Sequence, residues 1–416
     1  MTSTDPNYLA RKTQGVGLTD TEDRIDMRRL RGYRLGRVQE QLRQRDYGAV
    51  VLHDPINIRY TTGSRNTTIW GLHNASRCAF VPAEGKAVIF EFTRCEHLND
   101  GLETIGEVRP AISWFYFGAG ENMADQAKAW AKAIAGLVAE HCGGNKRLAL
   151  DHGNFQGTRA LEGLDIELRD GQEMMEQARL IKSADEIACM NHAISVCEAG
   201  IARMREALRP GMTENELWAK LHETNIAMGG EWIETRLLAS GGRTNPWFQE
   251  CGDKLIRAGE LVAFDTDLIG PFGYCADISR TFFCGPGRPS DEQKRLYGLA
   301  RDEVETNVEL LAPGLTFREF AEKSWRTPDE FMARRYPMPV HGVGMCDEWP
   351  ICVFFDERDS KAGYDGVFEP GMTVCVESYI GAEGGTEGVK LEEQVLITEH
   401  GVQRLSTFPY EDELFG

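Results

Sequence analysis

The sequence predicts an α/β domain followed by a larger α+β domain that is built from two similar halves. Three observations support this fold class. Strand-like and helix-like segments alternate up to about residue 170. A Pro-Gly turn followed by a capped helix then occurs twice, and an acid-containing hairpin lies at residues 261–283. We therefore expect one domain over residues 1–178 and a second over residues 179–416.

Composition restricts the classes of partner and compartment. The chain has 416 residues, 42% hydrophobic content and a formal net charge of −19. This charge repels phosphate backbones and anionic membranes, so we expect no nucleic acid and no membrane partner. The N-terminus lacks an apolar signal-peptide segment, and eleven cysteines without a CxxC pair are typical of a reducing compartment. The sequence therefore predicts a cytoplasmic protein.

The first domain begins with an amphipathic helix over residues 22–46, where apolar positions recur at roughly helical spacing. The aromatic stretch at residues 112–121 is expected in the core or an interface, with a pocket wall as the alternative. The other elements are expected in this order: a buried strand from Gly48, strands on both sides of a turn at residues 84–85, a helix over residues 122–141, a strand ending at Asp151 and a short helix after Asn154.

The second domain begins near Arg179 and repeats one pattern. In each half a long helix precedes a Pro-Gly turn and a second helix, which indicates duplication. The four helices open with residues in capping-box spacing: Ser183 with Glu186, Thr213 with Glu216, Ser290 with Gln293, and Thr316 with Glu319. We expect a functional site at the seam between the halves.

Three acids interrupt the apolar hairpin at residues 261–283. Side chains two apart share a strand face, so Asp265 and Asp267 are expected to point the same way. The Gly/Pro turn can return Asp277 beside them. Carboxylates held together resist ionisation unless a cation lies between them, which favours a metal site. The alternative is a solvent-facing hairpin that carries three acids.

Further candidate ligands follow on later strands. His341 opens a glycine-containing loop, Glu377 lies within a predicted strand, and Glu392 lies within another. Taken singly, His341 could be a turn or core residue, and Glu392 beside Glu393 could lie at the surface. The order Asp, Asp, His, Glu, Glu on successive strands nevertheless supplies carboxylates and one imidazole for two divalent cations.

These motifs resemble the pita-bread metallopeptidase family, which includes methionine aminopeptidase, aminopeptidase P, prolidase and creatinase. The matching segments are LIKSADEI, LVAFDTD, CADISRTF, HGVGM and VKLEEQVLIT, and PINIRYTTG is similar to the creatinase-type N-terminal domain. The resemblance implies a creatinase-like α/β domain followed by a pita-bread catalytic domain with pseudo-two-fold symmetry, and a homodimer. It also implies a set of metal ligands: Asp265, Asp277, His341, Glu377 and Glu392.

Departures from the peptidase pattern point to another reaction. Twelve positions separate Asp265 from Asp277, and the additional Asp267 is expected to be a ligand, or else to tune Asp265 electrostatically. Asp347 stands where a prolidase-like loop carries a second histidine, and Trp247 replaces the other substrate-contacting histidine. Losing both removes groups that steady the tetrahedral intermediate of an amide, which disfavours peptidolysis.

The altered pattern resembles the dimethylsulfoniopropionate (DMSP) lyases built on this fold. Such a lyase acts on a small zwitterion by β-elimination to dimethyl sulfide, acrylate and a proton. The resemblance implies Asp347 as the base, with Glu348 as the rival, and Trp247 and Tyr336 as cation–π partners of the sulfonium. It also implies two divalent ions, with iron favoured, while oxygen-rich ligands would accept manganese or zinc.

Three other functions are compatible with the fold. An Xaa-Pro dipeptidase or aminopeptidase with altered histidines is the main alternative. A binding module has no need of the ligand set, and a creatinase-like hydrolase works without metals. The complete set of ligand positions disfavours both of these functions.

Overall fold

The structure is a computed structural model that describes residues 25–74, 76–360 and 363–415. The chain divides into two compact units, and the division falls between Arg179 and Leu180. Each unit has its own buried hydrophobic cluster. The two units are therefore described separately.

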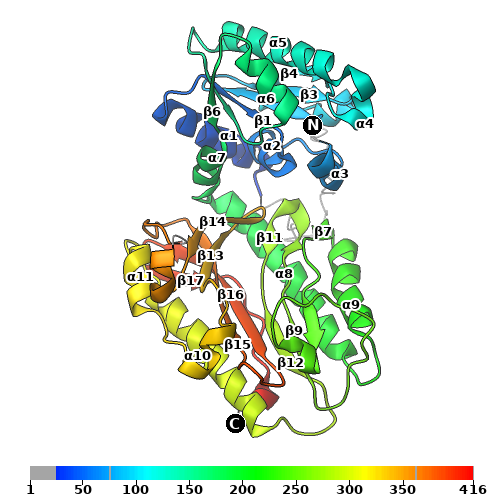
Figure 1. Cartoon of the computed structure of the whole chain (residues 1–416), viewed down its shortest axis with the longest axis vertical. Coiled ribbons are helices and arrows are strands. Elements are labelled where there is room, and N and C mark those ends of the chain that lie inside the picture. The colour runs from blue at the N-terminus through cyan, green and yellow to red at the C-terminus, as the bar shows by residue number, and fades with distance from the viewer. Residues whose placement is uncertain (1–24, 75, 361–362, 416) are drawn as a thin grey trace, which may run out of the picture. The chain divides into compact units, whose positions relative to one another are not determined.

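The first unit contains one six-stranded sheet with the strand order β4-β3-β2-β1-β5-β6 (Figure 1). Strand β1 is antiparallel to β2 and parallel to β5. Its helices and strands are α1 (Met27–Gln44), β1 (Ala49–Leu52), α2 (Pro55–Thr62), α3 (Thr68–His73), β2 (Cys78–Pro82), β3 (Ala87–Glu91), β4 (Ile105–Pro110), α4 (Tyr116–Ala119), α5 (Met123–His141), β5 (Arg147–Leu150), α6 (Phe155–Glu162), β6 (Glu167–Asp170) and α7 (Gln172–Arg179).

The elements expected in this unit are confirmed, with small shifts at their ends. Helix α1 matches the first predicted helix, although residues 22–24 of that prediction lie outside the described residues. Helix α5 buries positions three and four apart, including Trp130, Ile134 and Leu137, as an amphipathic helix must. The aromatic stretch divides, because Trp114 is buried whereas Phe117 is 80% exposed. Only part of that stretch therefore belongs to the core.

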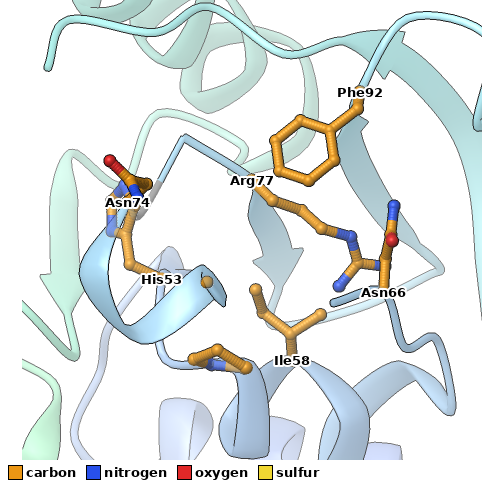
Figure 2. A pocket seen from close by; sticks show the side chains of 8 residues that line it. His53, Ile58, Asn66, Asn74, Arg77 and Phe92 are labelled. Carbon is orange, nitrogen blue, oxygen red and sulfur yellow. The ribbon is translucent and has the colours of Figure 1, made fainter. Parts of the chain in front are cut away.

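A small pocket in the first unit is lined by residues of α2, of α3 and of the loops next to them (Figure 2). Arg77 and Asn66, which line it, both contact the Glu91 carboxylate, at 2.7 and 3.0 Å. The cavity volume is about 10 Å³, which is room for one water molecule. This pocket is too small for an organic substrate.

The second unit consists of two halves that each begin with a long helix. Its helices and strands are α8 (Ala184–Ala207), α9 (Glu214–Ala227), β7 (Trp232–Ile233), β8 (Leu238–Ser240), β9 (Leu261–Phe264), β10 (Leu268–Ile269), β11 (Cys275–Ala276), β12 (Arg280–Phe283), α10 (Asp291–Leu310), α11 (Phe317–Lys323), β13 (Val340–Val343), β14 (Asp347–Cys352), β15 (Thr373–Ile380), β16 (Val389–Thr398) and β17 (Gly401–Arg404). All four predicted capping boxes are formed, at the starts of α8, α9, α10 and α11.

The strands of the second unit meet at a seam between its halves. One half contains the sheets β12-β9-β8 and β11-β10-β7, and the other contains the sheet β14-β13-β15-β16-β17. Figure 1 shows α8 and α9 beside the strands of the first half and α10 beside β15 and β16. Across the seam, the Glu392 amide donates to the Ser279 carbonyl at 3.1 Å, and the Lys390 amide donates to the Thr281 hydroxyl at 3.0 Å. The hairpin and β16 are thereby held together.

Two sequence-wide features complete the fold. Within the described residues, no helix combines the length and apolar character needed to cross a membrane. All eleven cysteines of the chain are free thiols, and eight of them are buried.

Candidate active site and metal centre

The predicted acidic hairpin is present, with a gap in its ladder where the acids lie. Leu268 pairs with Ala276, and Phe264 pairs with Arg280, so both ends of the hairpin keep one register. Between them the Thr266 hydroxyl replaces strand hydrogen bonds, since it donates to the Ala276 carbonyl and accepts from the Ile278 amide, both at 2.9 Å. Because these side-chain hydrogen bonds take the place of the ladder, the neighbouring Asp265 and Asp267 are not held in strand geometry.

The expectation that Asp265 and Asp267 share a strand face is wrong. The strand ends at Phe264, and Asp267 has φ of +35°, in the left-handed region. The acids nevertheless meet, because carboxylate oxygens of Asp265, Asp267 and Asp277 lie within 4.8 Å of one another. The Asp267 amide also donates to Asp277 Oδ1 at 3.3 Å. A backbone turn, and no strand alternation, therefore produces the convergence.

Three strands of the second half bring the remaining predicted ligands to the same place. In the register of β15 with β16, Glu377 stands directly opposite Glu392. The Nε2 atom of His341, on β13, lies 3.3 Å from Glu392 Oε1 and 3.5 Å from both Glu377 Oε1 and Asp277 Oδ2. All six predicted ligand side chains are buried or nearly so. The structure therefore brings the complete predicted set together.

The electrostatics of this cluster fit a bound cation. Burial, followed by repulsion from neighbouring carboxylates, raises the pKa of Asp267 and of Asp277 well above the usual range. Burial also raises the pKa of Glu377, to about 8. One oxygen of this group, Glu377 Oε1, is buried and accepts no hydrogen bond. Such a cluster is costly unless positive charge is added, and divalent cations supply it.

Lys390 is part of the cluster, although it was not among the residues predicted from the sequence. Its ammonium is fully buried and lies 2.7 Å from Glu377 Oε2 and 3.3 Å from oxygens of both Asp265 and Glu392. It stands two residues before Glu392 on β16, so strand alternation places both side chains on one face. That spacing was the available signal, and Lys390 adds a fixed positive charge to the cluster.

Ser279 is a second residue that was missed. Its hydroxyl lies 2.7 Å from Asp265 Oδ1, 2.7 Å from Glu392 Oε2 and 2.8 Å from Lys390 Nζ. Glu393 points the other way and forms a buried ion pair with Arg280 at 2.7 Å. The neighbouring acids on β16 therefore have different roles, and Ser279 orients two of the candidate ligands.

The two candidate bases on β14 occupy different environments. The Asp347 side chain is 54% exposed, and its Oδ1 lies 3.7 Å from Nδ1 of His341. Partial desolvation and the carboxylates of Glu392 and Glu348 raise the pKa of Asp347, while His341 and Lys390 act in the opposite direction. The Glu348 side chain is only 1% exposed and pairs with Lys182 at 3.0 Å. Asp347 is thus accessible beside the cluster, whereas Glu348 is enclosed.

The two predicted aromatic residues lie on the Lys390 side of the cluster. Trp247 is 7% exposed and stacks on Tyr379, with 6.0 Å between ring centroids. The Lys390 ammonium lies 5.1 Å from the Tyr336 ring centroid and 6.0 Å from that of Trp247. Both rings therefore already face one cation, which belongs to the protein itself.

The sequence patterns of two families cover nearly the whole described chain. The pattern of metallopeptidase family M24 matches residues 188–399, and that of the creatinase/prolidase N-terminal domain matches residues 34–181. The chain belongs to metallopeptidase family M24. The predicted fold class is thereby confirmed, and the carboxylate and histidine clusters agree with the metal-dependent character of this family.

Sequence identity with individual relatives distinguishes between the enzyme classes that share this fold. The chain is 44% identical to a dimethylsulfoniopropionate lyase, DddP, of Roseovarius nubinhibens, over 94% of this chain and 89% of that protein. It is 39% identical to the DddP of Roseobacter denitrificans, over 99% and 92%. A Pyrococcus furiosus Xaa-Pro dipeptidase is 29% identical over 58% of this chain and 67% of its own length.

Solved structures extend the comparison to the fold alone. An Xaa-Pro dipeptidase from Bacillus anthracis superposes with a TM-score of 0.73 at 23% identity. The match covers 92% of this chain and 99% of the dipeptidase. Peptidases and this chain therefore share an architecture, while the higher sequence identity is with DMSP lyases.

Proposed function

We propose that this enzyme is a carbon–sulfur lyase that cleaves DMSP by β-elimination. Removal of one proton from the carbon next to the substrate carboxylate forms a carbon–carbon double bond and breaks the carbon–sulfur bond. The products are dimethyl sulfide, acrylate and a proton. The identity with two DMSP lyases over almost the whole chain supports this reaction class. Within the site, the proposal is supported by the position of Asp347, a candidate base that lies beside the carboxylate cluster.

Asp347 is proposed as the general base. Its side chain is accessible, and it lies on the same strand pair as His341, so one hairpin presents a candidate ligand and a base. A raised carboxyl pKa strengthens a carboxylate as a base near neutral pH. Glu348 lacks this accessibility, because its carboxylate is enclosed with the Lys182 ammonium. We therefore assign the proton transfer to Asp347 and a structural role to Glu348.

We propose a centre for two divalent ions. The residues that would hold them are Asp265, Asp267, Asp277, His341, Glu377 and Glu392, whose candidate ligand atoms cluster within 4.8 Å in overlapping groups. Bound ions would draw electron density from the substrate carboxylate and make the adjacent proton removable. Oxygen-rich ligands with one imidazole suit iron, which we favour, as well as manganese or zinc.

Trp247 and Tyr336 are proposed to contact the sulfonium of the substrate. Aromatic faces attract cations by about 0.5–2 kcal/mol, depending on desolvation. The Lys390 ammonium faces both rings. Because like charges repel, the positively charged sulfonium would bind to the rings away from this ammonium. The two rings and Lys390 together would thus orient the zwitterion with its carboxylate toward the ligand cluster.

We further propose a homodimer in a reducing, cytoplasmic compartment. The dimer follows from the family resemblance. The compartment rests on cysteine usage, since eleven thiols include eight that are buried within the units. Gel filtration with light scattering would test the dimer.

One assay separates the lyase from its main alternative. Purified protein is incubated with DMSP and, separately, with a proline-containing dipeptide, after loading with Fe²⁺, Mn²⁺ or Zn²⁺. We expect dimethyl sulfide in the headspace by gas chromatography and acrylate in solution in equal amounts. Release of proline without dimethyl sulfide would instead establish an Xaa-Pro dipeptidase.

A further inference from the structure

Lys182 and Glu348 form a buried ion pair next to the proposed base. The ammonium and carboxylate are 3.0 Å apart, and the side chains are 2% and 1% exposed. Lys182 lies two residues before α8, and its backbone amide donates to the Gly371 carbonyl at 2.9 Å. The ammonium is therefore presented from a segment that is itself anchored.

Contacts other than the ion pair with Lys182 also hold the Glu348 carboxylate in place. Its Oε1 accepts the Met345 amide at 3.1 Å. It also packs against Gly344, where an added Cβ would lie only 2.4 Å from Oε1. Glycine at this position thus creates the space that the carboxylate fills. A buried carboxylate with a cation and an amide donor has little freedom to rotate.

A fixed Glu348 restricts the backbone that carries Asp347. The two residues are adjacent on β14, and successive strand side chains point to opposite faces. The pairing of β13 with β14 also shifts register, with Gly342 opposite Glu348 but His341 opposite Ile351. Next to such an irregularity the ladder alone constrains the strand less, so a side-chain anchor gains importance.

We propose that Lys182 is a positioning residue that acts through Glu348 to hold Asp347 toward His341 and the substrate. The inference rests on the proposed role of Asp347 as the base. In this role Lys182 and Glu348 act on the position of Asp347 and take no part in the proton transfer itself. Their contribution is to keep a half-exposed carboxylate in one productive geometry.

A double-mutant cycle tests the inference in the metal-loaded enzyme. Lys182→Met, Glu348→Gln and the double variant are compared with wild type, with Lys182→Arg as the conservative variant. Misplacement of a catalytic group costs about 10- to 100-fold in turnover, so we expect each single variant to lose that much kcat. We expect KM within about twofold and unchanged metal content, because Lys182 acts on the base alone. The double variant should be no worse than the more impaired single variant, and Lys182→Arg should recover part of kcat.

A matched control separates positioning from general stability. Arg205→Met removes another ion pair of the same unit, in which Arg205 makes two hydrogen bonds with Glu411 at 2.6 and 2.9 Å. This variant should lose thermal stability but keep kcat. DMSP deuterated at the carbon next to its carboxylate gives a further readout. A larger deuterium isotope effect on kcat in Lys182→Met than in wild type would support slower proton abstraction.

Three results would overturn the inference while leaving the lyase function standing. The first is a kcat of Lys182→Met within about twofold of wild type. The second is a fall in the kcat of Lys182→Met that parallels its loss of metal. The third is loss of turnover in Glu348→Gln while Lys182→Met keeps its turnover. The last result would transfer the catalytic role to Glu348 itself. Failure of the wild-type enzyme to release dimethyl sulfide would instead refute the proposed function on which the inference depends.

Discussion

Replacing Lys390 with Met removes the one ammonium that lies inside the ligand cluster in the part of the chain that the structure describes. Its ammonium is fully buried and contacts Asp265, Glu377 and Glu392 at 2.7–3.3 Å. Removing one partner of a buried ion pair costs about 3–5 kcal/mol, because the remaining charge is uncompensated. For a unit of this size, about 2–4 °C is lost per kcal/mol, which gives about 6–20 °C for the metal-free protein.

The decrease in melting temperature caused by Lys390→Met should be smaller after the protein is loaded with metal. Five candidate carboxylates carry −5, and Lys390 with two divalent ions carries +5, so the loaded site is balanced. Without Lys390 the ions still neutralise most of the charge. In the metal-free cluster only His341 is left to carry positive charge among these groups, because nearby carboxylates, acting against burial, raise its pKa well above the usual value. We therefore expect metal to raise the melting temperature more in Lys390→Met than in wild type.

Differential scanning calorimetry with EDTA and with added Mn²⁺ measures this difference. Arg205→Met serves as the control, because its ion pair with Glu411 involves no candidate ligand and should lose equal stability in both states. Equal losses for Lys390→Met in the chelated and loaded states would refute the reasoning. They would show that Lys390 and the metals do not share one charge cluster.

Four further predictions concern the base, the metals and the buried acid Glu303. Asp347→Ala should keep its metal and lose about 10²- to 10⁴-fold in turnover. Wild-type turnover in this variant, together with abolished turnover in metal-bound Glu348→Ala, would move the base assignment to Glu348. Elemental analysis should find up to two ions per wild-type chain and a loss in Asp277→Ala; a metal-free enzyme with full activity would contradict this. Asp267→Asn should also lose metal, whereas an unchanged metal titration would restrict Asp267 to electrostatic tuning. Burial raises the pKa of Glu303 from 4.5 to about 8, so the folded state holds a proton that the unfolded state releases. Stability of the metal-loaded protein should therefore fall by about 1.4 kcal/mol per pH unit as pH rises between these values, and Glu303→Gln should flatten that decline in urea titrations.

The order of elements and the identity of the candidate ligands could be predicted from the sequence, because both depend on short-range patterns. The capping boxes join residues three apart, and hydrophobic periodicity identifies α5 within a single segment. The ligand side chains Glu377 and Glu392 are likewise recognisable from acids placed inside apolar strands. These patterns can be recognised without knowing which residues far apart in the sequence are in contact.

The tertiary structure decided which neighbours these residues have. Asp267 adopts a left-handed conformation next to Thr266, whose hydroxyl replaces ladder bonds, and no alternation pattern reveals this. The choice between Asp347 and Glu348 depends on Lys182, which lies 166 residues from Glu348 in the chain. The sequence alone determined the segments and the chemistry they carry. Only the fold decided charge pairing, because burial and distance set the energy of a charged group, and both arise from residues far apart in the sequence.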